Sequence, residues 1–145
     1  MADRKISLSI KEHPDLFLGV TQGPGPQGYN YTLTAFRTDR AGTNWILRDI
    51  PGTSAQLLVK DGGVVSGMVV TFGAKGDYPT LRPYQEGNIE QFVIFMPLDV
   101  SYVAINNHDE THVMDRSMRA EDKGWVIAFP WNGGDNQRWD VTYYS

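Results

Sequence analysis

The chain contains no cysteine. This excludes disulfides and thiol nucleophiles, and it is compatible with a reducing compartment. Positive charge is also scarce, because 13 Lys and Arg stand against 17 Asp and Glu, which gives a net charge of -4. The basic residues are scattered along the chain and form no stretch that could follow a phosphate backbone. We therefore expect no nucleic-acid partner.

Long hydrophobic runs are missing as well. The first residues, MADRKISLSIKEHP, are charged and lack the apolar segment of about 7–15 residues that a signal peptide needs. No later stretch approaches the roughly 18 apolar residues that a membrane-spanning helix needs. We expect a cytoplasmic protein without membrane insertion, released, if at all, by a non-classical route.

Alternation of polar and apolar residues is common, whereas the 3.6-residue period of an amphipathic helix is scarce. Clusters of Gly, Pro, Asn and Asp separate the alternating segments, which are KISLSI (5–10), AQLLVK (55–60), MVVTF (68–72), QFVIF (91–95) and SYVAI (101–105). The 15 glycines and 8 prolines agree with many turns. The sequence predicts a single all-β domain that spans residues 1–145.

A repeat emerges when the chain is compared with itself at a fixed offset. Trp45, Phe92 and Trp139 stand 47 residues apart, and Leu47, Ile94 and Val141 keep the same spacing. A unit of about four short strands cannot bury its own apolar face, so we expect three units to share one core around a pseudo-threefold axis. That arrangement is a β-trefoil, with repeats of roughly 1–50, 51–98 and 99–145. The three aromatic side chains should be buried at equivalent positions.

The amides in WNGGDNQRWDV (131–141) are not explained by this repeat. At the 47-residue offset, Asn136 and Gln137 correspond to Gly42 and Thr43 in the first repeat and to Ile89 and Glu90 in the second. The fold can therefore be built without an amide pair at this place. This comparison points to a local function in the third repeat.

MDRSMRAEDKGWVIAFPWNGGDNQRW (114–139) resembles the ricin B-type β-trefoil lectins, whose repeats end in a Gln-any-Trp motif that Asn commonly precedes. VIAFPWNGGDNQRW (126–139) looks most like the mushroom (fungal) lectins of this class, the subgroup that binds galactose and N-acetylgalactosamine. The resemblance is specific in the third repeat and extends to the whole chain only through the 47-residue spacing.

The resemblance implies a sugar site with assigned roles. Asp115 stands at the aspartate that binds sugar hydroxyls, Asn136 at the asparagine that completes these contacts, and Gln137 at the glutamine that holds the aspartate. Phe129 occupies the stacking position, and Trp131, two residues later, could reach the same pocket. The implied function is a non-catalytic lectin for glycans with terminal galactose or N-acetylgalactosamine, with no cofactor and no metal.

The chemistry of these residues fits the implied ligand. A galactose-type sugar offers adjacent hydroxyls, which a carboxylate and an amide can bind, and an apolar face that packs on an aromatic ring. Because such a shallow site binds weakly, we expect a homodimer or a higher homo-oligomer. Alternatively, Asn136 shapes the turn before it and Asp115 caps a loop. In the first two repeats, GVTQG (19–23) and SGMVV (66–70) provide no carboxylate near the position of the aspartate.

Other motifs give weaker signals. HDETH (108–112) is similar to a zinc-protease motif, but Asp109 replaces the glutamate and strand and turn residues flank it, so we interpret it as a solvated hairpin loop. No serine has a recognisable histidine and aspartate partner set, which makes an enzyme the least supported class. The alternative function is a β-trefoil protease inhibitor that acts through QGPGPQG (22–28) or RTDRAG (37–42), with Arg37 or Arg40 entering the protease pocket.

Overall fold

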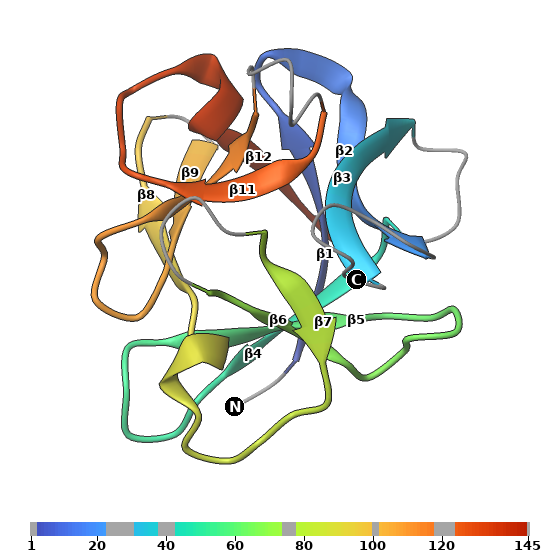
Figure 1. Ribbon diagram of the computed structural model, residues 1–145, viewed down its shortest axis with the longest axis vertical. Helices are drawn as coiled ribbons and strands as arrows, with labels where there is room; N and C mark the ends of the chain where they lie inside the picture. Colours follow the sequence, from blue (N-terminus) through green and yellow to red (C-terminus); the bar gives the residue numbers. More distant parts are fainter. Residues whose placement is uncertain are drawn as a thin grey trace.

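The computed structural model describes residues 3–22, 31–37, 43–73, 78–99, 102–117 and 124–144. Its regular secondary structure is almost entirely β-strand, as the sequence predicts (Figure 1). The strands are β1 (Arg4–Ile10), β2 (His13–Gln22), β3 (Tyr31–Arg37), β4 (Trp45–Asp49), β5 (Gln56–Lys60), β6 (Val69–Thr71), β7 (Thr80–Arg82), β8 (Ile94–Pro97), β9 (Tyr102–Asn106), β10 (Val113–Arg116), β11 (Val126–Phe129) and β12 (Trp139–Tyr144). Two short 3-10 helices, η2 (Ile89–Gln91) and η4 (Asp135–Gln137), precede β8 and β12.

A closed ring of strands forms the centre of the fold. β1 pairs with β12 on one side and with β4 on the other, and β4 pairs with β5. β5 is bridged to Val93, immediately before β8, through hydrogen bonds between Gln56 and Val93. β8 then pairs with β9, and β9 pairs with β12. The five ring strands other than β8 therefore have a neighbour on both sides, which protects their backbones from pairing with other chains, and β8 is joined to β5 through the residue just before it.

Three hairpins extend from the ring. They are β2–β3, β6–β7 and β10–β11, and each lies between two ring strands in the sequence. β3 contacts the other two hairpins through the pairs Thr32–Thr80 and Thr34–Trp125. In Figure 1, β3, β7 and β11 surround the middle of the molecule. The same order of ring strand, hairpin and ring strand thus occurs in β1–β4, β5–β8 and β9–β12.

The core fills the interior of the ring and hairpins. Trp45 and Trp139 are completely buried, and their indole N–H groups donate to the backbone oxygens of Leu18 (2.9 Å) and Met114 (3.2 Å). Each tryptophan therefore joins the end of a repeat to the first strand of that repeat's hairpin. The prediction that both are buried at equivalent positions is confirmed by these matching hydrogen bonds.

The prediction for Phe92 is wrong by one residue. Trp45 pairs with Ile6 and Trp139 with Val103, and the corresponding bridge in the second repeat is formed by Val93. Val93 is completely buried in the core, whereas the adjacent Phe92 is only half-buried. Because successive residues of an extended chain point to opposite sides, only one of the two can face the core. The even 47-residue spacing of the aromatic residues therefore does not mark the structural repeat.

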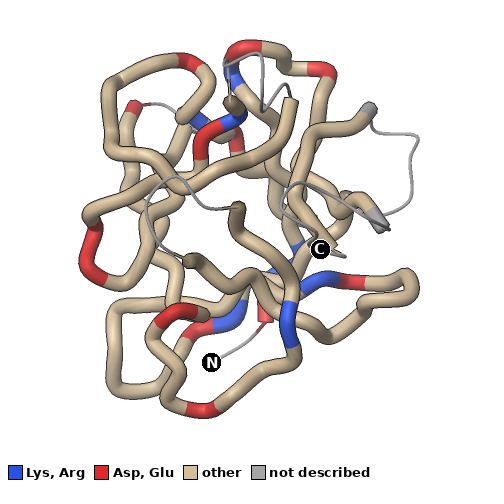
Figure 2. The backbone as a smooth tube through the Cα atoms, viewed as in Figure 1, with Lys and Arg blue, Asp and Glu red and all other residues tan. Residues whose placement is uncertain are grey.

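The segments predicted as strands agree with the structure except at this place. QFVIF (91–95) begins in the 3-10 helix η2, and the strand β8 starts only at Ile94. No helix in the described part of the chain is long and apolar enough to cross a membrane. Lys and Arg lie interspersed with Asp and Glu along the described backbone, as Figure 2 shows.

The burial of Trp139 can be tested by a single substitution. Trp139→Ala should lower the free energy of unfolding, measured by urea denaturation, by about 3–5 kcal/mol, because it removes a buried aromatic side chain and leaves a cavity.

The register of the second repeat can be tested by paired substitutions. Val93→Asn should destabilise strongly, because it buries an unpaired amide, and Phe92→Asn should cost much less. Urea denaturation followed by tryptophan fluorescence of the two asparagine variants measures the difference. A larger loss of unfolding free energy for Phe92→Asn than for Val93→Asn would show that Phe92 faces the core, as the 47-residue spacing predicts.

Candidate functional site

The candidate site lies on the outer face of the β10–β11 hairpin. Met114, Val126 and Ala128 belong to the core cluster, so strand alternation turns Asp115 and Phe129 to the opposite face. Asp115 lies across from Ile127, two residues before Phe129. The Asp115 side chain is nearly buried, and a carboxylate in this position needs hydrogen-bond donors around it.

Two side-chain amides supply these donors. Asn136 Nδ2 lies 2.9 Å from Asp115 Oδ1, and Gln137 Nε2 lies 2.8 Å from Asp115 Oδ2. The structure therefore brings together Asp115, Asn136 and Gln137, as the sequence predicts, although more than twenty residues separate the aspartate from the amides. Both carboxylate oxygens of Asp115 thus accept a hydrogen bond from a side-chain amide.

Gln137 is locked in place by its other hydrogen bonds. It is completely buried, its Nε2 also donates to the backbone oxygen of Pro130 (2.9 Å), and its Oε1 accepts from the backbone N–H of Asn132 (2.8 Å). The side chain thus joins the turn after β11 to Asp115 on β10. Gln137 is a bracing residue rather than an exposed ligand-binding group.

Asn136 is held more loosely and depends on a small neighbour. Its Nδ2 also lies 3.2 Å from the backbone oxygen of Arg116. A Cβ atom added at Gly134 would lie 2.5 Å from Asn136 Oδ1 and 3.0 Å from Asn132 Oδ1. The residue at 134 must therefore be glycine for both amide side chains to keep these positions.

The two candidate stacking residues differ in their surroundings. Phe129 is half-buried and shares the hairpin face with Asp115. Trp131 is 44% exposed, and the guanidinium of Arg138 lies 5.2 Å from its ring centroid. Arg138 also approaches the backbone oxygen of Gly133. One face of the Trp131 ring is therefore occupied by a cation.

The turn between β1 and β2 supports the site from the first repeat. The backbone N–H of Lys11 donates to Arg138 O (2.9 Å), and that of Glu12 donates to Asp135 O (3.2 Å). The Glu12 carboxylate also accepts from Arg116 Nη1 (2.8 Å) in a pair whose side chains are about one-fifth exposed (19% and 21%). Sequence patterns gave no sign of this support, because these residues lie more than a hundred positions from the motif.

The second repeat contains a counterpart of the glutamine brace. Gln91 is completely buried, donates from Nε2 to the backbone oxygen of Pro83 (2.9 Å) and to Thr71 Oγ1 (3.2 Å), and accepts from the backbone N–H of Gln85 (2.9 Å). The prediction that Glu90 corresponds to Gln137 is therefore wrong by the same single residue. A bracing glutamine thus occurs in two repeats, and Thr71 stands where the third repeat has Asp115.

The remaining predicted motifs give no further site. HDETH lies in the loop between β9 and β10, as predicted, and Thr111 donates to Asp109, which lowers the pKa of that carboxyl. Within the described residues, no group of three or more His, Asp or Glu could hold a metal ion. The inhibitor loops at 22–28 and 37–42 fall almost entirely outside the described residues.

No family model and no curated protein matches this chain. Solved structures do match. A designed 3-fold symmetric protein, ThreeFoil, has a TM-score of 0.77 at 19% identity, with 95% of this chain and 97% of that chain covered. The agglutinin of Rhizoctonia solani has a TM-score of 0.72 at 17% identity, over 99% and 97% of the two chains.

An exo-β-1,3-galactanase from Clostridium thermocellum has a TM-score of 0.75 at 19% identity. The alignment covers 97% of this chain but only 30% of the enzyme, so the likeness concerns one part of a longer protein. At these identities the matches show the fold alone. Together with the three ring-and-hairpin units, they show that the chain has a β-trefoil fold, which it shares with lectin-like proteins.

Proposed function

We propose that this protein is a non-catalytic lectin that binds glycans with terminal galactose or N-acetylgalactosamine at the third repeat. The observation that carries the proposal is the nearly buried Asp115 carboxylate, held by the amides of Asn136 and Gln137 on the outer face of a hairpin. The agglutinin and the galactanase among the similar structures add support, because their names refer to cell agglutination and to a galactose polymer.

The chemistry of binding follows from the hydrogen-bonding groups. Adjacent sugar hydroxyls donate to Asp115, and these charge-assisted bonds are the strongest contacts. Asn136 offers an amide oxygen as a further acceptor beside the carboxylate. Because Gln137 fixes the carboxylate before the ligand arrives, little ordering cost is paid on binding. Specificity for galactose-type sugars rests on the spacing of these two groups.

Phe129 is the aromatic residue that we assign to the apolar face of the sugar. It shares the hairpin face with Asp115, whereas Trp131 lies beyond the end of β11. A half-buried ring beside the carboxylate can pack against sugar C–H groups while the hydroxyls reach Asp115. Trp131, farther along the turn, would contact a neighbouring part of a longer glycan.

The first test of the site removes its polar groups one at a time. Asp115→Ala should abolish galactose binding at the β10–β11 site, and Asn136→Ala should weaken it there by about 1–3 kcal/mol, because each loses a hydrogen-bonding partner of the hydroxyls. Gln137→Ala should weaken binding less directly, by loosening Asp115. Gln91→Ala is the matched control, because it removes the same kind of brace from the second repeat. Isothermal titration calorimetry on samples shown to be folded measures the affinities.

The outcome distinguishes the sugar site from a purely structural role. If Gln137→Ala and Gln91→Ala lose similar stability but only the former loses sugar affinity, the brace serves the site. Full galactose binding by folded Asp115→Ala would show that the amides only shape the turn.

The stacking residue can be identified by a second pair of variants. Phe129→Ala should reduce affinity for free galactose by about tenfold, which corresponds to about 1.4 kcal/mol. Trp131→Ala should change monosaccharide affinity little, since its ring is already engaged by Arg138. The same titrations, repeated with a disaccharide, show whether Trp131 contributes beyond the first ring. A dominant loss for Trp131→Ala with the monosaccharide would reverse the assignment.

The proposed function also includes assembly. A single shallow site of this kind binds with a dissociation constant on the order of 0.1–1 mM, so useful avidity requires several sites held together. We therefore propose a homodimer or higher homo-oligomer. Multi-angle light scattering should give a mass at least twice 16.3 kDa at working concentration. A strictly monomeric protein would contradict this part of the proposal.

A further inference from the structure

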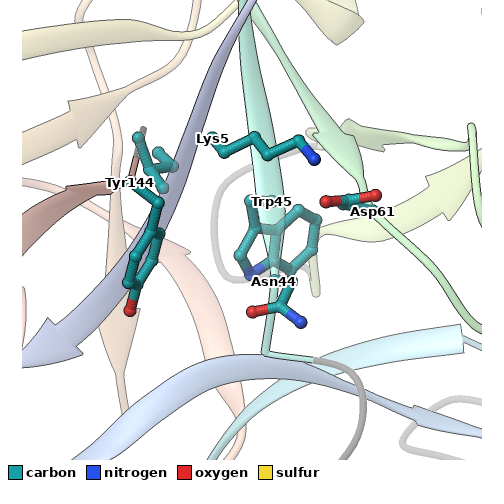
Figure 3. Close-up of a pocket in the computed structure, with 6 residues that line it drawn as sticks. Lys5, Asn44, Trp45, Asp61 and Tyr144 are labelled. Carbon is teal, nitrogen blue, oxygen red and sulfur yellow. The ribbon is translucent and has the colours of Figure 1, made fainter.

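A small recess lies on other strands than the β10–β11 site. It has a volume of about 150 Å³ and forms where β1, β4 and β12 meet the turn after β5. Its lining residues are Lys5, Ile6, Asn44, Trp45, Asp61 and Tyr144. Figure 3 shows Tyr144 on one side, Asp61 on the opposite side, and the Lys5 side chain extending between them with its nitrogen toward Asp61.

The recess combines groups that suit a hydroxyl-rich ring. Asp61 provides a carboxylate acceptor, Lys5 an ammonium donor, and Asn44 an amide that does both. Tyr144, 52% exposed, provides an aromatic face at the wall. These are the chemical types that meet at Asp115, Asn136 and Phe129, with an added cation that balances the carboxylate.

The lining is held in position by hydrogen bonds of its own. Lys60 is nearly buried, and its Nζ donates to the backbone oxygens of Asn44 (3.1 Å) and Asp61 (2.8 Å). The Asp61 N–H also donates to Asn44 O (3.0 Å), so the residues that carry the carboxylate and the amide are tied together. Burial lowers the pKa of Lys60, but these carbonyl contacts satisfy its ammonium.

The aromatic wall is fixed as well. The Tyr144 hydroxyl lies 2.8 Å from Ser7 Oγ on β1, and the backbone of Tyr144 is paired with Lys5. A ring already oriented in this way loses little conformational freedom when a ligand packs against it. The floor below, made by Ile6 and Trp45, is completely buried core.

We propose that this recess is a second carbohydrate site, which takes one neutral sugar ring. One hydroxyl of a vicinal pair donates to Asp61, its neighbour accepts from Lys5 or Asn44, and the C–H face packs on Tyr144. The volume is smaller than the about 300–1,000 Å³ of sites that enclose drug-sized ligands, which favours a single ring over an oligosaccharide. Because the two charges offset each other, a neutral sugar fits better than an anion.

This site goes beyond the proposed function, because it shares no residue with the β10–β11 site. A chain with two unlike sites could bridge two glycans without forming an oligomer. The two sites can therefore be tested separately, and the failure of one does not imply the failure of the other.

The test is a titration of ¹⁵N-labelled Asp115→Ala protein with galactose, N-acetylgalactosamine, glucose and mannose, followed by NMR. At least one sugar should shift the backbone amides of Lys5, Asn44, Asp61 and Tyr144 in a saturable manner, with a dissociation constant on the order of 1–10 mM. Wild-type protein, titrated in parallel, reports on the β10–β11 site.

Variants of the recess define the chemistry. Asp61→Asn and Tyr144→Ala should weaken this binding about five- to tenfold or more, while Tyr144→Phe, which keeps the ring, should retain most of it. Tyr143→Ala and Asp109→Asn are matched controls at exposed positions outside the lining, and they should leave the affinity unchanged.

If no sugar shifts the recess amides while wild-type protein still binds galactose through Asp115, the second site does not exist and the proposed function stands. If the recess responds but the β10–β11 site does not, the proposed function fails and this inference stands. Shifts that Tyr144→Ala and Asp61→Asn leave unchanged would also overturn the inference.

Discussion

The hydrogen bond from a buried tryptophan to a hairpin carbonyl joins the two parts of this fold. An indole N–H in the core needs an acceptor, and Trp45 and Trp139 find theirs at Leu18 and Met114. Since Met114 directly precedes Asp115, the contact that packs the core also sets the position of the candidate carboxylate. In the second repeat Val93 cannot donate such a bond, and the Gln91 contact with Thr71 connects the same two segments instead.

The sequence predicted the fold well because its strongest signal, alternating short strands with buried aromatic residues, reflects core packing. Trp45 and Trp139 are large apolar side chains, and both are completely buried in the core. The second repeat was misaligned because Phe92 is the larger residue beside Val93, and spacing alone favours the aromatic one. In the structure, the pairing of Val93 with Gln56 determines that Val93, and not Phe92, faces the core. The sequence contains no pattern that indicates this pairing.

The candidate site was predictable to the extent that it is local. Asn136 and Gln137 stand together near Trp139, and the resemblance to a known motif led from them to Asp115. Because Gln91 makes the same kind of contacts as Gln137, the glutamine stabilises the fold in two repeats. The Asp115 carboxylate and Asn136, in contrast, are particular to the third repeat. The contacts of Lys11 and Glu12, and the recess around Tyr144, arise from residues far apart in the chain, where no local pattern could indicate them.

The pairing of β1 with β12 has a consequence for synthesis of the protein. Ile6, Leu8 and Ile10 lie opposite residues that the ribosome adds more than a hundred positions later. Until those residues have been synthesised, this strand has a partner on one side at most, so its apolar side chains stay open to chaperones or to premature association. Contacts of such long range also slow folding. The ring can close only when Trp139–Tyr144 have left the exit tunnel.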